Sequence, residues 1–149
     1  MLKIKLLLNA LFLYISVHAQ TTSTPEQITV QQTIVNLFAA LTNADTVAMK
    51  TFATTTVRFY EYGEAWPMDT LISKVMKSKA IAGFKRTNTF EFVNTTIKKN
   101  TAWASYYLQS TITRNGKEEF VKWMETVVLI RDKKQWKIDV LHSTRLSKK

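Results

Sequence analysis

Residues 101–145 read TAWASYYLQSTITRNGKEEFVKWMETVVLIRDKKQWKIDVLHSTR. Two short polar turns, Asn115-Gly116 and Lys133-Lys134, divide this stretch. Asn-Gly is the strongest short signal for a hairpin turn, and apolar residues alternate with polar ones on both sides of it. The stretch therefore predicts three long antiparallel strands, at about residues 102–114, 117–131 and 135–145.

The turns also predict which residues lie opposite one another. A two-residue Asn-Gly turn pairs Arg114 with Lys117, and counting back along both strands places Tyr106 opposite Glu125. The same counting from the second turn places Glu125 opposite His142. Tyr106, Glu125 and His142 are therefore predicted to form one row across three adjacent strands.

This row is polar on a face that is otherwise predicted to be apolar. The apolar members of the face are Ala102, Ala104, Leu108, Val121, Trp123, Val127, Leu129, Trp136, Ile138 and Val140. A phenol, a carboxylate and an imidazole can satisfy one another as a structural hydrogen-bond network. Alternatively, the row is the floor of a pocket, where a desolvated carboxylate exchanges protons with the imidazole. Tyr106, Glu125 and His142 are the candidate catalytic residues.

The residues before this stretch have helical signals. Thr24-Pro25-Glu26-Gln27 combines an N-cap, a proline at the first helical position and a glutamine that closes a capping box, which predicts a helix to about Asn43. Asp45 is predicted to cap a short second helix. Pro67 is predicted to open a third.

Two further strands are predicted, at residues 54–62 and at about 90–98, from their β-branched and aromatic residues. Helices that precede a run of long strands are typical of an α+β fold. We therefore expect three N-terminal helices packed on one face of a strongly curved antiparallel sheet.

The first residues have the pattern of a signal peptide. Two lysines flank the start of an apolar run over residues 4–17, and Val17-His18-Ala19 presents small residues for cleavage. The run is shorter than the roughly 20 apolar residues of a membrane-spanning helix, so no membrane span is expected. We expect a signal peptide over residues 1–19, an N-terminal extension over 20–27 and one domain over 28–147, secreted or periplasmic.

Composition argues against several classes of function. The net charge is +10, but the basic residues are scattered and no motif would read bases, so no nucleic-acid partner is expected. The absence of cysteine and the presence of only two histidines argue against a metal site. None of the three glycines belongs to a phosphate-binding loop, and no cofactor is expected.

Three segments carry a resemblance to a known family. The chain resembles the closing strands of NTF2-like (SnoaL-like) domains of exported bacterial proteins at Trp123-Met124-Glu125-Thr126, at residues 135–138 and at Leu141-His142-Ser143-Thr144-Arg145. The order of elements from Ile28 to Leu146 fits as well. The resemblance implies a cone-shaped domain, an apolar pocket between the long first helix and the bent sheet, and frequent dimerisation through the outer sheet face.

The resemblance leaves the activity open, because this superfamily includes isomerases, cyclases, dehydratases, transport adaptors and binding domains without chemistry. Its isomerases use an aspartate base with a tyrosine and a protonated aspartate as donors. Here Asp45 and Asp69 are predicted at helix starts, and Asp139 is predicted to point outward. The isomerase pattern is therefore not reproduced.

We expect a domain that binds a small, largely apolar ligand between helices and sheet, with polar recognition by Glu125 and His142. The predicted ligand-binding residues are Phe38, Trp66, Trp123, Val127 and Val140. An acid–base enzyme of the isomerase, cyclase or dehydratase type and a structural or protein-interaction module are the alternatives. The outer face carries Trp103 and Tyr107, which favours a homodimer through it.

Overall fold

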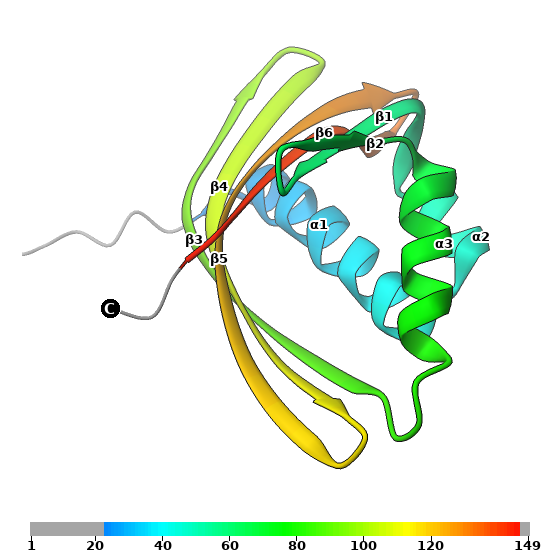
Figure 1. Cartoon of the computed structure of the whole chain (residues 1–149). Helices are drawn as coiled ribbons and strands as arrows, with labels where there is room; N and C mark the ends of the chain where they lie inside the picture. The colour runs from blue at the N-terminus through cyan, green and yellow to red at the C-terminus, as the bar shows by residue number, and fades with distance from the viewer. Residues whose placement is uncertain (1–22, 147–149) are drawn as a thin grey trace, which may run out of the picture.

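A single bent sheet wraps around the first helix in the computed structural model, which describes residues 23–146 (Figure 1). The predicted signal peptide over residues 1–19 lies outside the described residues. The elements are α1 (Pro25–Asn43), α2 (Thr46–Thr51), β1 (Ala53–Glu61), β2 (Glu64–Trp66), α3 (Met68–Lys79), β3 (Lys85–Lys98), β4 (Thr101–Arg114), β5 (Lys117–Asp132) and β6 (Gln135–Arg145). The predicted α+β class, with three helices on one face of a strongly curved sheet, is confirmed. No helix in this part of the chain is long and apolar enough to cross a membrane.

The helix starts follow the local signals in the sequence. The Thr24 hydroxyl accepts a hydrogen bond from the Gln27 amide at 3.3 Å, and the Gln27 side chain accepts one from the Thr24 amide at 2.8 Å. Asp45 accepts from the Ala48 amide at 2.9 Å and caps α2. These bonds satisfy amide groups that a helix leaves unpaired at its N-terminus.

The strands follow the order β2-β1-β6-β5-β4-β3. β1 pairs with β6 in parallel, whereas the other pairs are antiparallel, so the sheet is mixed and differs here from the antiparallel expectation. β3 also begins at Lys85, earlier than the predicted strand. α1 lies in the concave side of the sheet and α3 crosses its open end (Figure 1).

The register of β4 against β5 is the predicted one. Arg114 pairs with Lys117 and Tyr106 pairs with Glu125. Between β5 and β6 the predicted register is wrong, because the pairing shifts between Leu129 and Val128.

The shift comes from one extra residue in β6. Leu129 pairs with Ile138 but Val128 pairs with Val140, so Asp139 forms a β-bulge. A shift of one residue moves every later side chain to the other face. Leu141 and Ser143 are therefore buried on the concave face, whereas His142 is exposed on the outer face.

Contacts from β1 hold this bulge. The Asp139 carboxylate accepts hydrogen bonds from the hydroxyls of Thr54 at 2.7 Å and Thr56 at 3.3 Å. The amide of Ile138 donates to the carbonyl of Phe52 at 2.9 Å. The bulge is thus formed where β6 meets its parallel neighbour.

Candidate functional site

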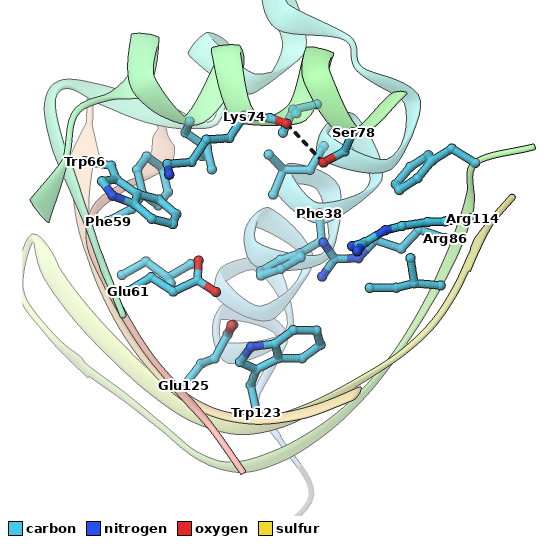
Figure 2. A pocket seen from close by; sticks show the side chains of 16 residues that line it. Phe38, Phe59, Glu61, Trp66, Lys74, Ser78, Arg86, Arg114, Trp123 and Glu125 are labelled. Carbon is cyan, nitrogen blue, oxygen red and sulfur yellow. Dashed lines mark hydrogen bonds between the residues drawn. The ribbon is translucent and has the colours of Figure 1, made fainter. Parts of the chain in front are cut away.

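A cavity of about 200 Å³ lies between α3 and the concave face of the sheet (Figure 2). Much of its wall is apolar, including Phe38, Leu41, Phe59, Trp66, Leu71, Val75, Phe84, Ile112, Trp123 and Leu141. Its polar lining residues come from five different elements and are Glu61, Lys74, Ser78, Arg86, Arg114 and Glu125. A concave, mostly apolar site with a few convergent polar groups is typical of small-molecule binding.

Glu125 is the charged residue on the floor of the cavity, and it is only 4% exposed. Its Oε1 atom accepts a hydrogen bond from the Ser143 hydroxyl at 2.9 Å, whereas Oε2 has no partner among the described residues. Its carboxyl group points up from the floor toward Glu61 (Figure 2). Burial raises the pKa of Glu125 to about 7, against the lowering effect of the Tyr106 and Ser143 hydroxyls.

Tyr106 pairs with Glu125 across β4 and β5, and Trp123 lies beside Glu125 in the cavity (Figure 2). The Tyr106 hydroxyl and the Trp123 indole nitrogen are both buried without a partner in the described part of the chain. Tyr106 packs against the rings of Phe90 and Phe92, with centroids 5.6 and 5.2 Å away. Burial, and then the charge of Glu125, raise the pKa of Tyr106 well above its usual value. An unpartnered buried donor or acceptor costs about 1–3 kcal/mol of stability.

Arg86 forms part of the opposite wall and is held there by a polar network. Its Nε donates to Asn88 Oδ1 at 2.9 Å, and the same oxygen accepts from the Ser110 hydroxyl at 2.6 Å. The guanidinium carbon lies 5.8 Å from the Phe38 ring centroid and 5.5 Å from that of Trp123. Burial lowers the pKa of Arg86, while the charge of Glu125 opposes that shift.

Arg114 adds a second positive charge beside Arg86 (Figure 2). Its proximity contributes to the lowered pKa of Arg86. On the other side of the cavity, burial raises the pKa of Glu61, although Arg86 and Lys74 oppose the shift. The cavity therefore has guanidinium groups on one wall and carboxyl groups on another, with aromatic rings between them.

Lys74 extends from α3 over the mouth of this site. Its ammonium lies 4.0 Å from the Trp66 ring centroid and 4.0 Å from a carboxylate oxygen of Glu64. The Trp66 indole donates to the same carboxylate at 2.5 Å. Trp66 and Lys74 are thus tied to each other at the rim by a shared acidic partner.

The residues selected from the sequence fall into three groups. Those that line the cavity are Phe38, Trp66, Trp123 and Glu125. Those that are buried without lining it are Tyr106 and Val127. Those that lie past the bulge, off the predicted face, are Val140 and His142. The predicted contact between Glu125 and His142 is therefore wrong, and Ser143 is the hydrogen-bond partner of Glu125 instead.

Sequence reasoning missed Glu61, Arg86 and Arg114. Arg86 lies before the strand predicted to start near residue 90, although the alternation of Arg86, Asn88 and Phe90 continues the strand pattern backward. Arg114 is predicted only as the partner of Lys117 at the hairpin turn. Among residues 23–146, no cluster of three or more histidine, aspartate or glutamate side chains could hold a metal ion.

No family model matches the sequence, and no curated protein matches it. Solved structures do resemble the fold. A nuclear transport factor 2 (NTF2-like) superfamily protein from Salmonella enterica aligns with a TM-score of 0.69 and 16% identity, over 82% of this chain and 92% of that one.

Two other structures align at least as fully. A ketosteroid isomerase-like protein from Erwinia carotovora atroseptica has a TM-score of 0.65 and 16% identity, over 85% of this chain and 100% of that one. The CaMKII hub of S. rosetta has a TM-score of 0.70 and 16% identity, over 84% of this chain and 100% of that one. Likeness at such identities concerns the fold and leaves the activity open. The cone of three helices on a bent six-stranded sheet, shared with these proteins, identifies this chain as a domain with the NTF2-like fold.

Proposed function

We propose that this domain binds a small ligand with an apolar body and a carboxylate, which Arg86 and Arg114 hold in the cavity. The observation that carries the proposal is the Arg86 guanidinium, which faces an aromatic cavity and forms no ion pair within residues 23–146 (Figure 2). A partly buried charge without a counter-ion is unfavourable. A ligand carboxylate would supply that counter-ion, and the planar guanidinium suits bidentate contact with it.

The volume of the cavity limits the size of the ligand. A cavity of about 150 Å³ accommodates benzene, so about 200 Å³ accommodates one substituted ring. The aromatic walls fit such a ring, and this refines the expectation of a largely apolar ligand. A fused four-ring molecule such as a steroid exceeds this volume.

The test compares 4-methylbenzoate with 4-methylbenzamide, which has the same shape and no charge. Binding is followed by titration calorimetry and by NMR of the folded protein. We expect the carboxylate to bind at least about tenfold more tightly, since a charge-assisted hydrogen bond contributes about 1.5–3 kcal/mol. Arg86→Gln and Arg114→Gln should each remove most of this advantage.

The matched control is Arg58→Gln. Arg58 is exposed and does not line the cavity. Its guanidinium group donates hydrogen bonds to the backbone carbonyls of Thr56 and Val57. Arg58→Gln should leave the affinity unchanged. Equal affinity for the two probes, or equal losses in all three variants, would refute an arginine-based anion site and favour a structural or interaction module.

Proton transfer is a second candidate function for the same cavity. The pKa of Glu125, raised to about 7, allows this carboxyl group to gain and lose a proton near neutrality. A suitable probe is 4-acetylbenzoate in D₂O, whose methyl protons lie next to a carbonyl group. Enzyme-dependent deuterium uptake that is lost in Glu125→Gln would support acid–base catalysis, and unchanged methyl signals would argue against it.

We also propose that the domain acts after export, because residues 1–19 have the pattern of a signal peptide. Intact-mass analysis of the exported protein should find these residues removed. Recovery of the full-length chain from the membrane fraction would contradict the proposal.

A homodimer through the outer sheet face is the proposed assembly. On that face, Lys122 lies over the Tyr107 ring at 4.6 Å and Lys98 over the Trp103 ring at 5.6 Å. Aromatic residues on an outer face are typical of interfaces. Light scattering should give twice the protomer mass at tens of micromolar, and Trp103→Lys should produce the monomer. A monomeric parent protein would exclude this assembly.

A further inference from the structure

We propose that the ligand of this cavity is a hydroxycarboxylic acid built on one ring, with a hydroxyl group at the end opposite the carboxylate. This inference rests on the proposed function, because the arginine wall is taken to hold the carboxylate. The further step is to identify a second functional group of the ligand, a hydroxyl group, which the end of the cavity opposite the arginines selects.

The charged side chains of the cavity are separated in space. Arg86 and Arg114 lie together at one side, whereas Glu125 lies on the floor facing Glu61 at the other (Figure 2). The rings of Phe38 and Trp123 lie between these two groups (Figure 2). A ligand whose carboxylate meets the guanidinium groups therefore directs its far end toward Glu125.

The polar atoms at that far end need a partner that both donates and accepts. Glu125 Oε2 is a buried acceptor and Trp123 Nε1 is a buried donor, and neither has a partner among the described residues. A hydroxyl group donates one hydrogen bond and accepts up to two, so it can satisfy both atoms. An ammonium group leaves the indole unpaired, an aldehyde leaves the ionised carboxylate unpaired, and a methyl group leaves both unpaired.

A hydroxyl group also fits both protonation states of Glu125. When the carboxyl group is ionised, the ligand hydroxyl donates to it and accepts from the indole. When the carboxyl group is protonated, the ligand hydroxyl accepts from both. None of the other three groups satisfies the floor in both states.

The site excludes the predicted imidazole as the partner at this end. His142 is exposed on the outer face, and Ser143 already donates to the other oxygen of Glu125. Tyr106 lies opposite Glu125 on the adjacent strand, is fully buried and does not line the cavity. Oε2 of Glu125 is therefore the carboxylate atom left for a ligand.

The experiment uses four compounds on one rigid frame: 4-(hydroxymethyl)benzoate, 4-(aminomethyl)benzoate, 4-formylbenzoate and 4-methylbenzoate. Their affinities for the wild-type protein are measured by titration calorimetry at pH 7. We expect the hydroxymethyl compound to bind about tenfold more tightly than 4-methylbenzoate, because it removes two unsatisfied buried groups. The aminomethyl and formyl compounds should gain less.

Two conservative variants identify the atoms that are responsible. Trp123→Phe keeps the ring and removes the indole donor, and Glu125→Gln keeps the shape and removes the charge. Each should reduce the preference for hydroxymethyl over methyl by about threefold or more, without abolishing the binding of 4-methylbenzoate. Glu118→Gln, an exposed site on the same strand, is the control and should leave the preference unchanged.

The outcomes separate the two proposals. If 4-methylbenzoate binds through Arg86 and the hydroxymethyl compound binds no more tightly, the hydroxyl inference is overturned and the anion site stands. If a preference for hydroxymethyl survives in both variants, the hydroxyl group lies elsewhere and the inference is again overturned. If none of the four compounds binds, both proposals fail. If a variant does not fold, the wild-type series alone decides between these outcomes.

Discussion

Two halves of the same concave sheet face have opposite characters. In one half, Ala102, Leu129 and Ile138 lie side by side on β4, β5 and β6 and are 0% exposed. A few residues further along β5, Trp123 and Glu125 bring unpartnered polar atoms to the lining of a cavity. The β4–β5 pairing is continuous through both halves, whereas the β5–β6 pairing shifts between them at the Asp139 bulge.

The half around Ala102, Leu129 and Ile138, here called the packed half, accounts for stability. The half around Glu125, here called the hollow half, does not. Burial of a leucine side chain contributes about 1.5–3 kcal/mol, whereas each unpartnered buried polar atom costs about 1–3 kcal/mol. Under the proposed function, a ligand satisfies the polar groups that destabilise the free domain. One half then serves folding and the other recognition, and each prediction below tests that division.

The largest effect on stability is expected in the packed half. Leu129→Ala removes a fully buried side chain and should lower the free energy of unfolding by about 2–5 kcal/mol. Urea denaturation measures it. The affinity of the folded fraction for 4-methylbenzoate should stay the same, because Leu129 does not line the cavity. A loss below about 1 kcal/mol would mean that this half is not the main source of stability.

In the hollow half, Glu125→Gln should raise the free energy of unfolding at high pH, whereas Leu129→Ala lowers it. The pKa of Glu125 rises from 4.5 to about 7 on folding, so the folded protein binds more protons than the unfolded chain between these values. The stability that this carboxyl group contributes is complete below pH 4.5 and is lost as the pH rises through 7.

Glu125→Gln cannot lose a proton, so it should be more stable than the parent protein at pH 8 by about 1–3 kcal/mol and similar to it at pH 4. Chemical denaturation at several pH values measures the difference. The free energy of unfolding of the variant should still fall somewhat as the pH rises, because burial also raises the pKa of Glu61. A variant less stable than the parent at pH 8 would place Glu125 in a favourable structural ion pair.

Ser143→Ala is expected to have a smaller effect on stability. It removes the hydrogen bond that Ser143 donates to Glu125, and the free energy of unfolding should fall by about 1 kcal/mol. The pKa of Glu125 should rise further, because the Ser143 hydroxyl lowers it. Carboxyl ¹³C NMR follows that titration. An unchanged pKa of Glu125 would show that the Ser143 hydroxyl does not act on this carboxyl group.

His142→Ala should have the smallest effect, within about 0.5 kcal/mol, since the side chain is exposed on the outer face. Under the register predicted from the sequence, His142→Ala would instead break a buried hydrogen-bond network and destabilise the protein strongly. Thermal unfolding of His142→Ala beside Ser143→Ala therefore tests the bulge at Asp139 directly. Stronger destabilisation by His142→Ala than by Ser143→Ala would restore the predicted register.

Features set by neighbouring residues were predictable from the sequence alone. The capping box at Thr24, the Asp45 cap and the hairpin at Asn115-Gly116 each depend on contacts within a few residues, and all three are present. The pairing of Tyr106 with Glu125 follows, since uninterrupted alternation carries the register away from a known turn. The α+β class required no more than the order of these local patterns.

Tertiary structure decided the rest, because the deciding contacts join distant parts of the chain. The bulge at Asp139 is held by Thr54, which is 85 residues away, and no glycine or turn signal marks it in β6. That one extra residue replaced His142 by Ser143 beside Glu125. The early start of β3 brought Arg86 to the cavity, where Asn88 and Ser110 orient it. Local propensity specifies the elements, whereas the residues that face the cavity depend on how separate strands come together, which only the packed sheet determines.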